Sequence, residues 1–156
     1  MILRELHDGD VAEIRQWPVY QGDMLPLDYA LRSQGWLDTL RNQPGVTTLV
    51  AVVANELIGF TLLMRTGAAA AEFRIALRAD KIGQGWGKTI AALTLQRGCT
   101  ELGLSRVYLI VRKRNSRAIR LYQRLGFTVC GECRRAIQGL LVEFLEMAID
   151  CRQFHP

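Results

Sequence analysis

The amino-acid sequence predicts one α+β domain in which helices flank a mixed, mostly antiparallel sheet. The first indication is a hairpin pattern, because residues 46–53 and 57–65 are rich in β-branched and apolar residues and are only three residues apart. The second is the i, i+3, i+4, i+7 spacing of apolar positions within residues 118–125, which is typical of an amphipathic helix. Strands and helices that alternate in this way predict the order β-α-α-β-β-β-α-β-α-β-β.

The N-terminal elements follow from local signals. Residues 2–6 are a plausible first strand, and the acid-x-x-Glu form that begins at Asp10 predicts the start of a first helix. Prolines and glycine interrupt the pattern over residues 18–27, which predicts a loop. Apolar residues near helical spacing predict a second helix over residues 28–41, which a Gln-Pro-Gly sequence ends. After the hairpin and a short glycine- and alanine-rich turn, residues 72–78 are expected to form the next strand.

The C-terminal elements are predicted in the same way. A helix is expected over residues 88–102, where a glycine stops it. A buried strand follows at residues 107–111, and Asn115 is expected to cap a short helix. Residues 127–129 and 140–149 are expected to complete the sheet.

Length and composition fit a single domain over residues 1–156, since the chain has 49% hydrophobic residues. No apolar run reaches the ~18 residues of a membrane-spanning helix, and the N-terminus lacks the order of a signal peptide. We therefore expect a cytoplasmic protein with no membrane partner and with reduced cysteines. Cys130 and Cys133 form one C-x-x-C without a second pair of metal ligands nearby, so no metal is expected. The cysteines concerned are Cys99, Cys130, Cys133 and Cys151.

The net charge of +5 is unevenly distributed. Residues 1–64 hold four basic and eight acidic residues, a net charge of −4, whereas residues 65–156 hold 16 basic and seven acidic residues, a net charge of +9. This split suggests two different partners, although solvated faces explain it as well. The basic part would also suit a nucleic-acid-binding module. No zinc-finger spacing, aromatic RNA-binding motif or stacking platform supports that reading, so no nucleic-acid partner is expected.

Residues 82–88 read Ile-Gly-Gln-Gly-Trp-Gly-Lys and lie between an expected strand and an expected helix. Glycines there permit a tight turn with exposed N–H groups, and the N-terminus of a helix carries about half a positive charge, so the segment suits a phosphate. Its spacing is neither that of a P-loop nor that of a dinucleotide-binding fingerprint. Taken alone, the glycines are explained equally well by a tight connection between strand and helix.

Residues 115–127 have the form N-x-x-A-x-x-L-Y-x-x-x-G-F and begin 28 residues after Gly87. The glycine turn followed by this helix resembles the GNAT superfamily of N-acetyltransferases. The resemblance is close over residues 71–127. It extends weakly over residues 131–149, toward the branch of ribosomal-protein N-terminal and polyamine acetyltransferases, and the first 45 residues match in element order alone. It implies a GNAT-like fold that transfers an acetyl group from acetyl-CoA to a primary amine, on a small molecule or a protein N-terminus, by direct attack.

The resemblance also implies roles for individual residues. Tyr122 corresponds to the tyrosine that protonates the departing CoA thiolate. Glu72 is the carboxylate nearest to the cofactor strand in the sequence, and it is a candidate base or anchor for the substrate's positive charge; an ion pair with Arg74 or Arg78 is the structural alternative. The residues expected to bind the cofactor are Ile75, Ala76, Leu77, Gly83, Gln84, Gly85, Trp86, Gly87, Lys88 and Asn115.

Two positions depart from the family's pattern. Ile82 stands where the phosphate loop usually has Gln or Arg, and Ile110 stands where the ribosomal branch often has a catalytic Glu. A regulatory domain that binds acetyl-CoA without turnover is therefore the alternative function. The retained Tyr122 favours turnover, because binding alone needs no acid for the thiolate. The charge split favours a cationic amine as acceptor, and a homodimer is left open as the assembly.

Overall fold

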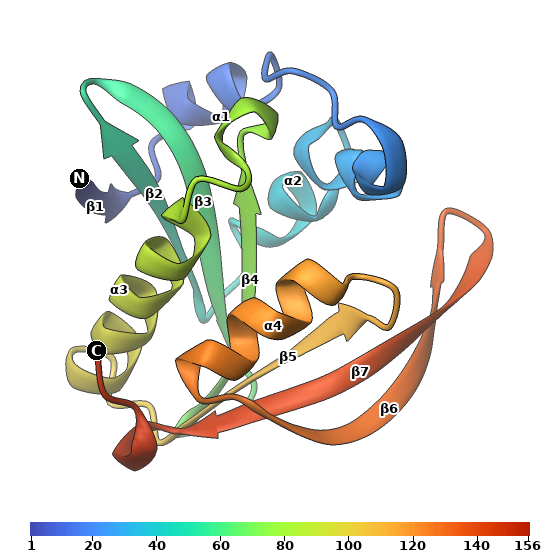
Figure 1. Ribbon diagram of the computed structural model, residues 1–156. Coiled ribbons are helices and arrows are strands. Elements are labelled where there is room, and N and C mark those ends of the chain that lie inside the picture. The colour runs from blue at the N-terminus through green and yellow to red at the C-terminus, as the bar shows by residue number, and fades with distance from the viewer. The chain divides into compact units, whose positions relative to one another are not determined.

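The computed structural model describes residues 1–156 and confirms the predicted order of strands and α-helices (Figure 1). The strands are β1 (Ile2–Glu5), β2 (Val46–Val53), β3 (Glu56–Arg65), β4 (Ala70–Leu77), β5 (Arg106–Arg112), β6 (Thr128–Ile137) and β7 (Leu140–Asp150). The α-helices are α1 (Asp8–Ile14), α2 (Trp36–Leu40), α3 (Trp86–Thr100) and α4 (Ser116–Leu125). Three 3₁₀ segments complete the chain, η1 (Gly22–Leu31), η2 (Ala79–Lys81) and η3 (Cys151–Gln153).

The chain forms two compact units, and β4 and α3 each have residues in both units. The first unit comprises Met1–Met64 and Arg74–Thr94, and the second comprises Arg65–Phe73 and Leu95–Pro156. In the first unit, β2 pairs antiparallel with β1 and β3, and the second half of β4 follows β3. In the second unit, the first half of β4 pairs parallel with β5, which pairs antiparallel with β7, and β7 pairs antiparallel with β6.

The strand order is therefore β1-β2-β3-β4-β5-β7-β6. The β4–β5 pair is parallel, and the pairs β1–β2, β2–β3, β5–β7 and β6–β7 are antiparallel, which confirms the predicted mixed, mostly antiparallel sheet. A single domain over residues 1–156 stays a prediction. The structure contains no helix with both the length and the apolar character that crossing a bilayer requires.

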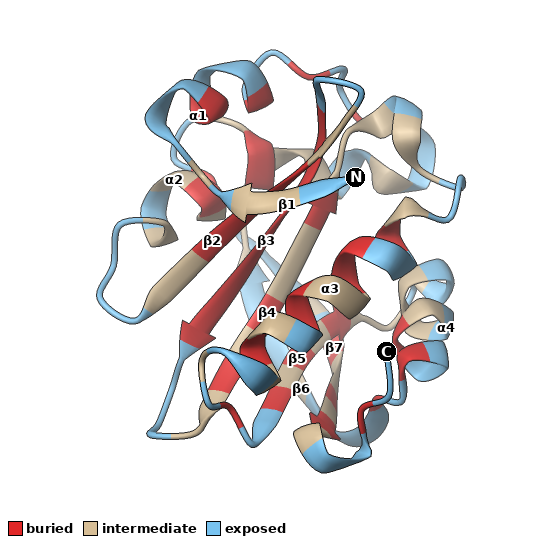
Figure 2. Cartoon of the chain, turned by 90° about the vertical axis from the view of Figure 1, so that its left-hand side faces the viewer, coloured by how far each residue is buried: buried red, intermediate tan, exposed pale blue.

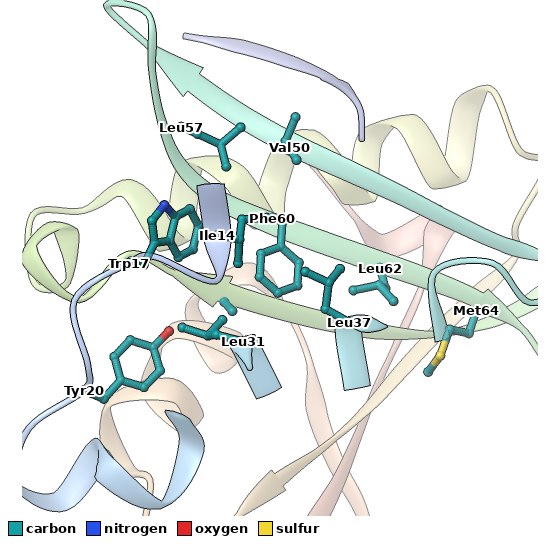
Figure 3. Packing of buried hydrophobic residues seen from close by; sticks show 11 residues of the cluster. Ile14, Trp17, Tyr20, Leu31, Leu37, Val50, Leu57, Phe60, Leu62 and Met64 are labelled. Atoms are coloured by element: carbon teal, nitrogen blue, oxygen red, sulfur yellow. The ribbon is translucent and has the colours of Figure 1, made fainter. Parts of the chain in front are cut away.

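The core of the first unit is built around Phe60 of β3, which is fully buried (Figure 3). The rings of Trp36 and Trp17 lie 5.3 Å and 6.2 Å from it between ring centroids. Buried residues follow one another along β2 and β3 (Figure 2), because side chains on both faces of β3 are covered. The large aromatic area that this cluster removes from water stabilises the unit.

The predicted start of the first helix is wrong. The first helix begins at Asp8 rather than Asp10, with His7 as its N-cap residue. Asp10 is the third residue of the helix, and its carboxylate accepts a hydrogen bond from the His7 backbone N–H at 2.7 Å. The same carboxylate forms a two-pronged ion pair with Arg4, at 2.7 Å and 2.9 Å. The capping box is therefore real but is placed three residues earlier, and the pairing with Arg4 lowers the pKa of Asp10.

The predicted loop at 18–27 and helix at 28–41 are also wrong. The 3₁₀ segment η1 covers Gly22–Leu31, and α2 covers only Trp36–Leu40. A continuous helix is interrupted between them because Gln34 has a left-handed φ of 63°. A Cβ at Gly35 would lie 2.1 Å from the carbonyl oxygen of Tyr29, so the chain also folds too tightly there for any side chain.

The expectation of four reduced cysteines is wrong for two of them. Cys99 and Cys151 form a disulfide with a Cα–Cα distance of 5.6 Å across a sequence separation of 52 residues. The last turns of α3 and the residue that follows β7 meet at one end of the second unit, a proximity that spacing in the sequence does not reveal. Cys130 and Cys133 are free thiols on β6, as expected for a strand that carries two cysteines.

The sixth strand is much longer than the three residues predicted for it. β6 runs over Thr128–Ile137 and pairs with β7 through a tight turn at Gln138 and Gly139, whose φ angles are 49° and 79°. Most of its residues are exposed, because β6 is the last strand of the sheet order. Polar side chains along such an edge hide the strand from a search for apolar residues. The other strands, and the helices α3 and α4, lie close to their predicted bounds.

A pair of buried hydroxyls links β3 to α3 in the first unit and provides a test of its packing. Thr61 and Thr94 are fully buried, their Oγ1 atoms are 2.9 Å apart, and Thr94 also donates to the carbonyl of Ile90 at 2.9 Å. Thr94→Val leaves the Thr61 hydroxyl without its acceptor, so we expect the free energy of unfolding to fall by about 1–3 kcal/mol.

Urea unfolding of single and double variants measures this effect. Because Thr61→Val/Thr94→Val removes both partners, we expect it to be more stable than the sum of the two single losses predicts. Strictly additive losses would show that the two hydroxyls do not interact.

Candidate active site

The second half of β4 carries the three residues that the family resemblance assigns to cofactor binding. Ala76 is buried in the core cluster of Phe60, whereas Ile75 and Leu77 pack against a separate cluster of buried residues. A Cβ at Gly59 of β3 would lie 2.8 Å from the Leu77 side chain and 3.1 Å from the Ala76 carbonyl oxygen. Glycine at position 59 therefore allows β3 and β4 to approach closely, and side-chain packing on both faces holds this part of β4 in place.

The glycine turn leads from η2 directly into α3. Gly83 and Gly85 have φ angles of 83° and 88°, a left-handed conformation that glycine adopts without strain. Residues 83–85 are exposed, and a Cβ at Gly85 would meet no atom within 4 Å. The first turn of α3 contains no acidic residue, and Lys88 within it is exposed. The N-terminal N–H groups of a helix have no partner within the helix, so this turn fits an anionic group such as a phosphate.

Two side chains of the turn are used within the protein. Ile82 packs against the core cluster of the first unit, so the apolar residue at this position anchors the turn instead of contacting a phosphate. The Gln84 side chain donates to the backbone carbonyl of Asp80 at 2.8 Å. Binding of an anion at the turn would therefore depend on backbone N–H groups and on Lys88.

Tyr122 lies in the second unit, on the buried face of α4. Its ring makes edge-type contacts with Phe73 of β4 and with Phe127, at centroid distances of 6.3 Å and 5.8 Å. Burial raises the pKa of the Tyr122 hydroxyl well above its usual value near 10. The phenol therefore stays protonated at neutral pH, which is the form that can donate a proton.

Asn115 caps α4 as predicted. Its side-chain oxygen accepts a hydrogen bond from the backbone N–H of Ala118 at 3.2 Å. Gly126 ends the helix in a left-handed conformation with a φ of 102°. The helix that carries Tyr122 is thus fixed at both ends by the residues that define the motif.

Glu72 faces a group of polar side chains in the second unit that the sequence did not indicate. Burial raises the pKa of the Cys133 thiol, with further contributions from a hydrogen bond to Glu146 and from the negative charges of Glu146 and Glu72. Glu72 lies on β4, which is an inner strand of the sheet, between β3 and β5 in the strand order. Arg78, one of its suggested partners, pairs with Asp80 and Glu56 at 2.7 Å and 3.5 Å.

Glu146 lies on β7 in direct register with Ile110 of β5. Residues opposite each other in an antiparallel pair project from the same face of the sheet. The carboxylate that is absent at position 110 thus has a counterpart on the neighbouring strand. The signal in the sequence was Glu146 itself, one of three acidic residues in an otherwise largely apolar strand, but nothing in its spacing from the motif at residues 115–127 marks it as a base.

Half of the acidic residues in the N-terminal part are paired within it. Each of its four arginines pairs with an aspartate of the same unit: Arg4 with Asp10, Arg15 with Asp38, Arg32 with Asp28, and Arg41 with Asp8. These four carboxylates hold the N-terminal segments together, and the net charge of −4 of residues 1–64 comes from the other four acidic residues.

The predicted site residues divide between the two units. The cofactor strand, the glycine turn and Lys88 belong to the first unit, whereas Glu72, Asn115 and Tyr122 belong to the second. Within the second unit, Phe73 contacts the Tyr122 ring. Glu72, the residue before Phe73, contributes with Glu146 to the raised pKa of the Cys133 thiol. Adjacent residues of β4 therefore contribute to two different faces of the sheet.

Comparison with known proteins connects this arrangement to one family. The model of the Acetyltransferase (GNAT) family matches residues 10–127. A spermidine N(1)-acetyltransferase of Escherichia coli K12 is 44% identical over 86 residues, which are 54% of this chain and 46% of that protein. The chain thus aligns with about half the length of the curated relatives that it matches.

Solved structures match over nearly the whole chain. A spermidine N-acetyltransferase chimera from Vibrio cholerae and hSSAT has a TM-score of 0.80 at 25% identity, with 98% of each chain covered. Spermidine N-acetyltransferase from Vibrio cholerae in complex with CoA and spermine has a TM-score of 0.73 at 22% identity, covering 97% of this chain and 96% of that one. The fold predicted from the resemblance is confirmed, and with the family match over residues 10–127 this chain belongs to the Acetyltransferase (GNAT) family.

Proposed function

We propose that this protein transfers an acetyl group from acetyl-CoA to a primary amine of a polyamine. The observation that carries the proposal is Tyr122, a buried tyrosine on a helix that has the family's motif and that is capped by residues of that motif. A domain that merely binds acetyl-CoA has no need of a proton donor. The identity of 44% to spermidine N(1)-acetyltransferase supports a polyamine as the acceptor class.

Residues of the first unit would hold the donor. The backbone of Ile75, Ala76 and Leu77 offers hydrogen-bonding groups to the amide-containing arm of CoA, in the manner of an added strand. The exposed glycine turn, the first N–H groups of α3 and Lys88 suit the phosphates. From the second unit, Asn115 is assigned to the cofactor by the motif alone.

Residues of the second unit would perform the proton transfers. An ammonium group with a pKa near 10 is mostly protonated at pH 7 and has to lose a proton before it can attack a thioester. Glu146 and Glu72 can hold the cationic acceptor and accept that proton, directly or through water. As the C–N bond forms and the C–S bond breaks, the nitrogen loses its second proton to a carboxylate or to water, and Tyr122 donates its proton to the departing thiolate. The tyrosine is then reprotonated from solvent.

A regulatory domain that binds acetyl-CoA without turnover is the second candidate. Ile110, at the position of the catalytic glutamate in one branch of the family, favours it. The position of Glu146 opposite Ile110 weakens this argument, because it supplies a carboxylate on the same face.

We also propose that the protein works in the cytoplasm, where the Cys99–Cys151 disulfide would be exposed to reducing conditions, and that it assembles as a homodimer. Leu140 and Leu141, at the start of β7, are 71% and 67% exposed. Neighbouring apolar side chains with this exposure support a contact with a second protein surface.

The glycine turn is tested by changes at Gly85. We expect Gly85→Glu to weaken CoA binding by about 2 kcal/mol or more, because a carboxylate would lie where a phosphate is proposed to bind. Gly85→Ala is the matched control, since it introduces the same backbone strain at a φ of 88° without the charge. Calorimetry with CoA should show the larger loss for Gly85→Glu, and equal affinities in the two folded variants would remove the turn from the phosphate site.

Tyr122→Phe tests the proposed acid. The ring and its contacts with Phe73 and Phe127 are kept, so CoA affinity should stay within about threefold, while kcat should fall ~10²-fold or more through loss of the proton donor. A thiol-release assay with spermidine measures kcat, and CoA titration measures binding. An unchanged kcat would exclude Tyr122 from the reaction, and tight CoA binding without turnover of any amine would favour the regulatory domain.

Glu146→Gln tests the carboxylate face. It keeps the shape of the side chain but removes the charge, so we expect the KM for spermidine to rise about five- to tenfold, as for a lost charge-assisted interaction of ~1 kcal/mol or more. The KM for acetyl-CoA should remain unchanged. Glu143→Gln on the same strand is the matched control, because Glu143 is exposed and pairs with Arg134 and Lys113. Equal effects of the two substitutions on the spermidine KM would contradict a specific role of Glu146.

A further inference from the structure

The last peptide group of the cofactor strand is fixed from two sides within the first unit. The N–H of Arg78 donates to the carbonyl of Ile58 on β3 at 2.9 Å. The carbonyl of Leu77, which belongs to the same peptide group, accepts a hydrogen bond of 2.5 Å from the hydroxyl of Tyr20. The N–H and C=O of a trans peptide point in opposite directions, so Tyr20 occupies the edge of β4 that faces away from β3.

This edge is where an added strand would pair. In an extended strand, the N–H and C=O of one residue point to the same edge, and successive residues alternate between edges. Because Arg78 pairs toward β3, the groups on the opposite edge belong to Ile75 and Leu77. Tyr20 takes one of these four groups. The N–H and C=O of Ile75 and the N–H of Leu77 are the groups left for a ligand.

Tyr20 is itself held by a network of charged side chains. Its backbone N–H donates to Asp28 at 3.0 Å, and Asp28 pairs with Arg32 through two contacts of 2.8 Å. Arg32 also donates to the backbone carbonyls of Arg15 and Trp17, at 2.7 Å and 3.1 Å. The pairing with Arg32 lowers the pKa of Asp28, so the network stays charged at neutral pH.

The Tyr20 ring is buried in the core cluster of Trp17, Leu31 and Phe60 (Figure 3). Burial and the neighbouring Asp28 charge raise the pKa of its hydroxyl far above 10. The phenol is therefore a neutral donor at every pH at which the protein would work. A hydroxyl that would otherwise be buried without a partner is satisfied by the carbonyl of the cofactor strand.

From this geometry we infer that Tyr20 is a positioning residue for acetyl-CoA: by occupying the Leu77 carbonyl, it fixes the end of the cofactor strand and limits strand-like pairing to Ile75 and the Leu77 N–H. The inference rests on the proposed function, in which the donor pairs with β4. The Leu77 N–H is also the group suited to polarise the thioester carbonyl, so an error in its orientation would affect both binding and rate.

Tyr20→Phe removes the hydroxyl and keeps the ring in the core. We expect the dissociation constant of CoA and the KM for acetyl-CoA to rise about five- to tenfold, which corresponds to one lost hydrogen bond. The KM for spermidine should stay within about twofold. Tyr29→Phe is the matched control, because Tyr29 lies on the same segment and its hydroxyl makes no hydrogen bond within the protein.

A general loss of stability is separated from positioning by Thr94→Val, which weakens the core of the same unit without touching the end of β4. It should lower the unfolding midpoint and leave the KM for acetyl-CoA unchanged. If Tyr20→Phe does not stay folded, Asp28→Asn replaces it, since it loosens the same segment and should raise the KM for acetyl-CoA in the same selective way.

The outcomes distinguish this inference from the proposed function. Calorimetry with CoA needs no turnover, so a CoA affinity of folded Tyr20→Phe equal to that of the wild type overturns the inference whether or not an amine is acetylated. Equal rises of both KM values would also overturn it, because they would indicate a structural role only. Absence of acetyl transfer by the wild type, with CoA binding weakened by Tyr20→Phe, overturns the proposed function and supports the positioning role.

Discussion

The close approach of β3 and β4 at Gly59 is the constraint on which the rest of the first unit depends. A Cβ at position 59 would lie 2.8 Å from the Leu77 side chain and 3.1 Å from the Ala76 carbonyl oxygen, so a larger residue there would force these neighbours to shift. The same close approach brings the Leu77–Arg78 peptide to the point where Ile58 and Tyr20 bind its two ends. The path from β4 through η2 to the glycine turn starts from this fixed peptide.

Charge near the N-terminus of this protein has mainly structural uses. Four of the five aspartates of residues 8–38 are engaged by arginines of the same unit, and the Asp28–Arg32 pair organises the segment that carries Tyr20. Paired charges of this kind are worth little when exposed, but partly buried pairs with several hydrogen bonds fix a conformation. Glu72 and Glu146 instead lie on one face of the second unit, next to a thiol whose pKa they help to raise. That face is where we place the cationic acceptor.

In the mechanism that we propose, neighbouring residues of β4 support both proton transfers. Phe73 packs against the Tyr122 ring, and its neighbour Glu72 is directed to the other face, because successive side chains of a strand alternate. In the mechanism that we propose, the proton leaves the amine toward the carboxylates and reaches the thiolate from the tyrosine.

The sequence by itself determined the order of the elements, the β2–β3 hairpin, the glycine turn and the cap of α4 by Asn115. Each of these is encoded by residues close together in the chain, through alternation, helical spacing or the conformational preferences of glycine and asparagine. The tertiary structure decided the features that join distant residues: the Cys99–Cys151 disulfide, the position of Glu146 opposite Ile110, and the hydrogen bond from Tyr20 to Leu77. It also decided where the helix after η1 begins, because the left-handed Gln34 and the crowding at Gly35 override the helical spacing of the neighbouring leucines. Local patterns specify secondary structure since they act within a few residues, whereas register and packing depend on contacts that exist only once the chain has folded.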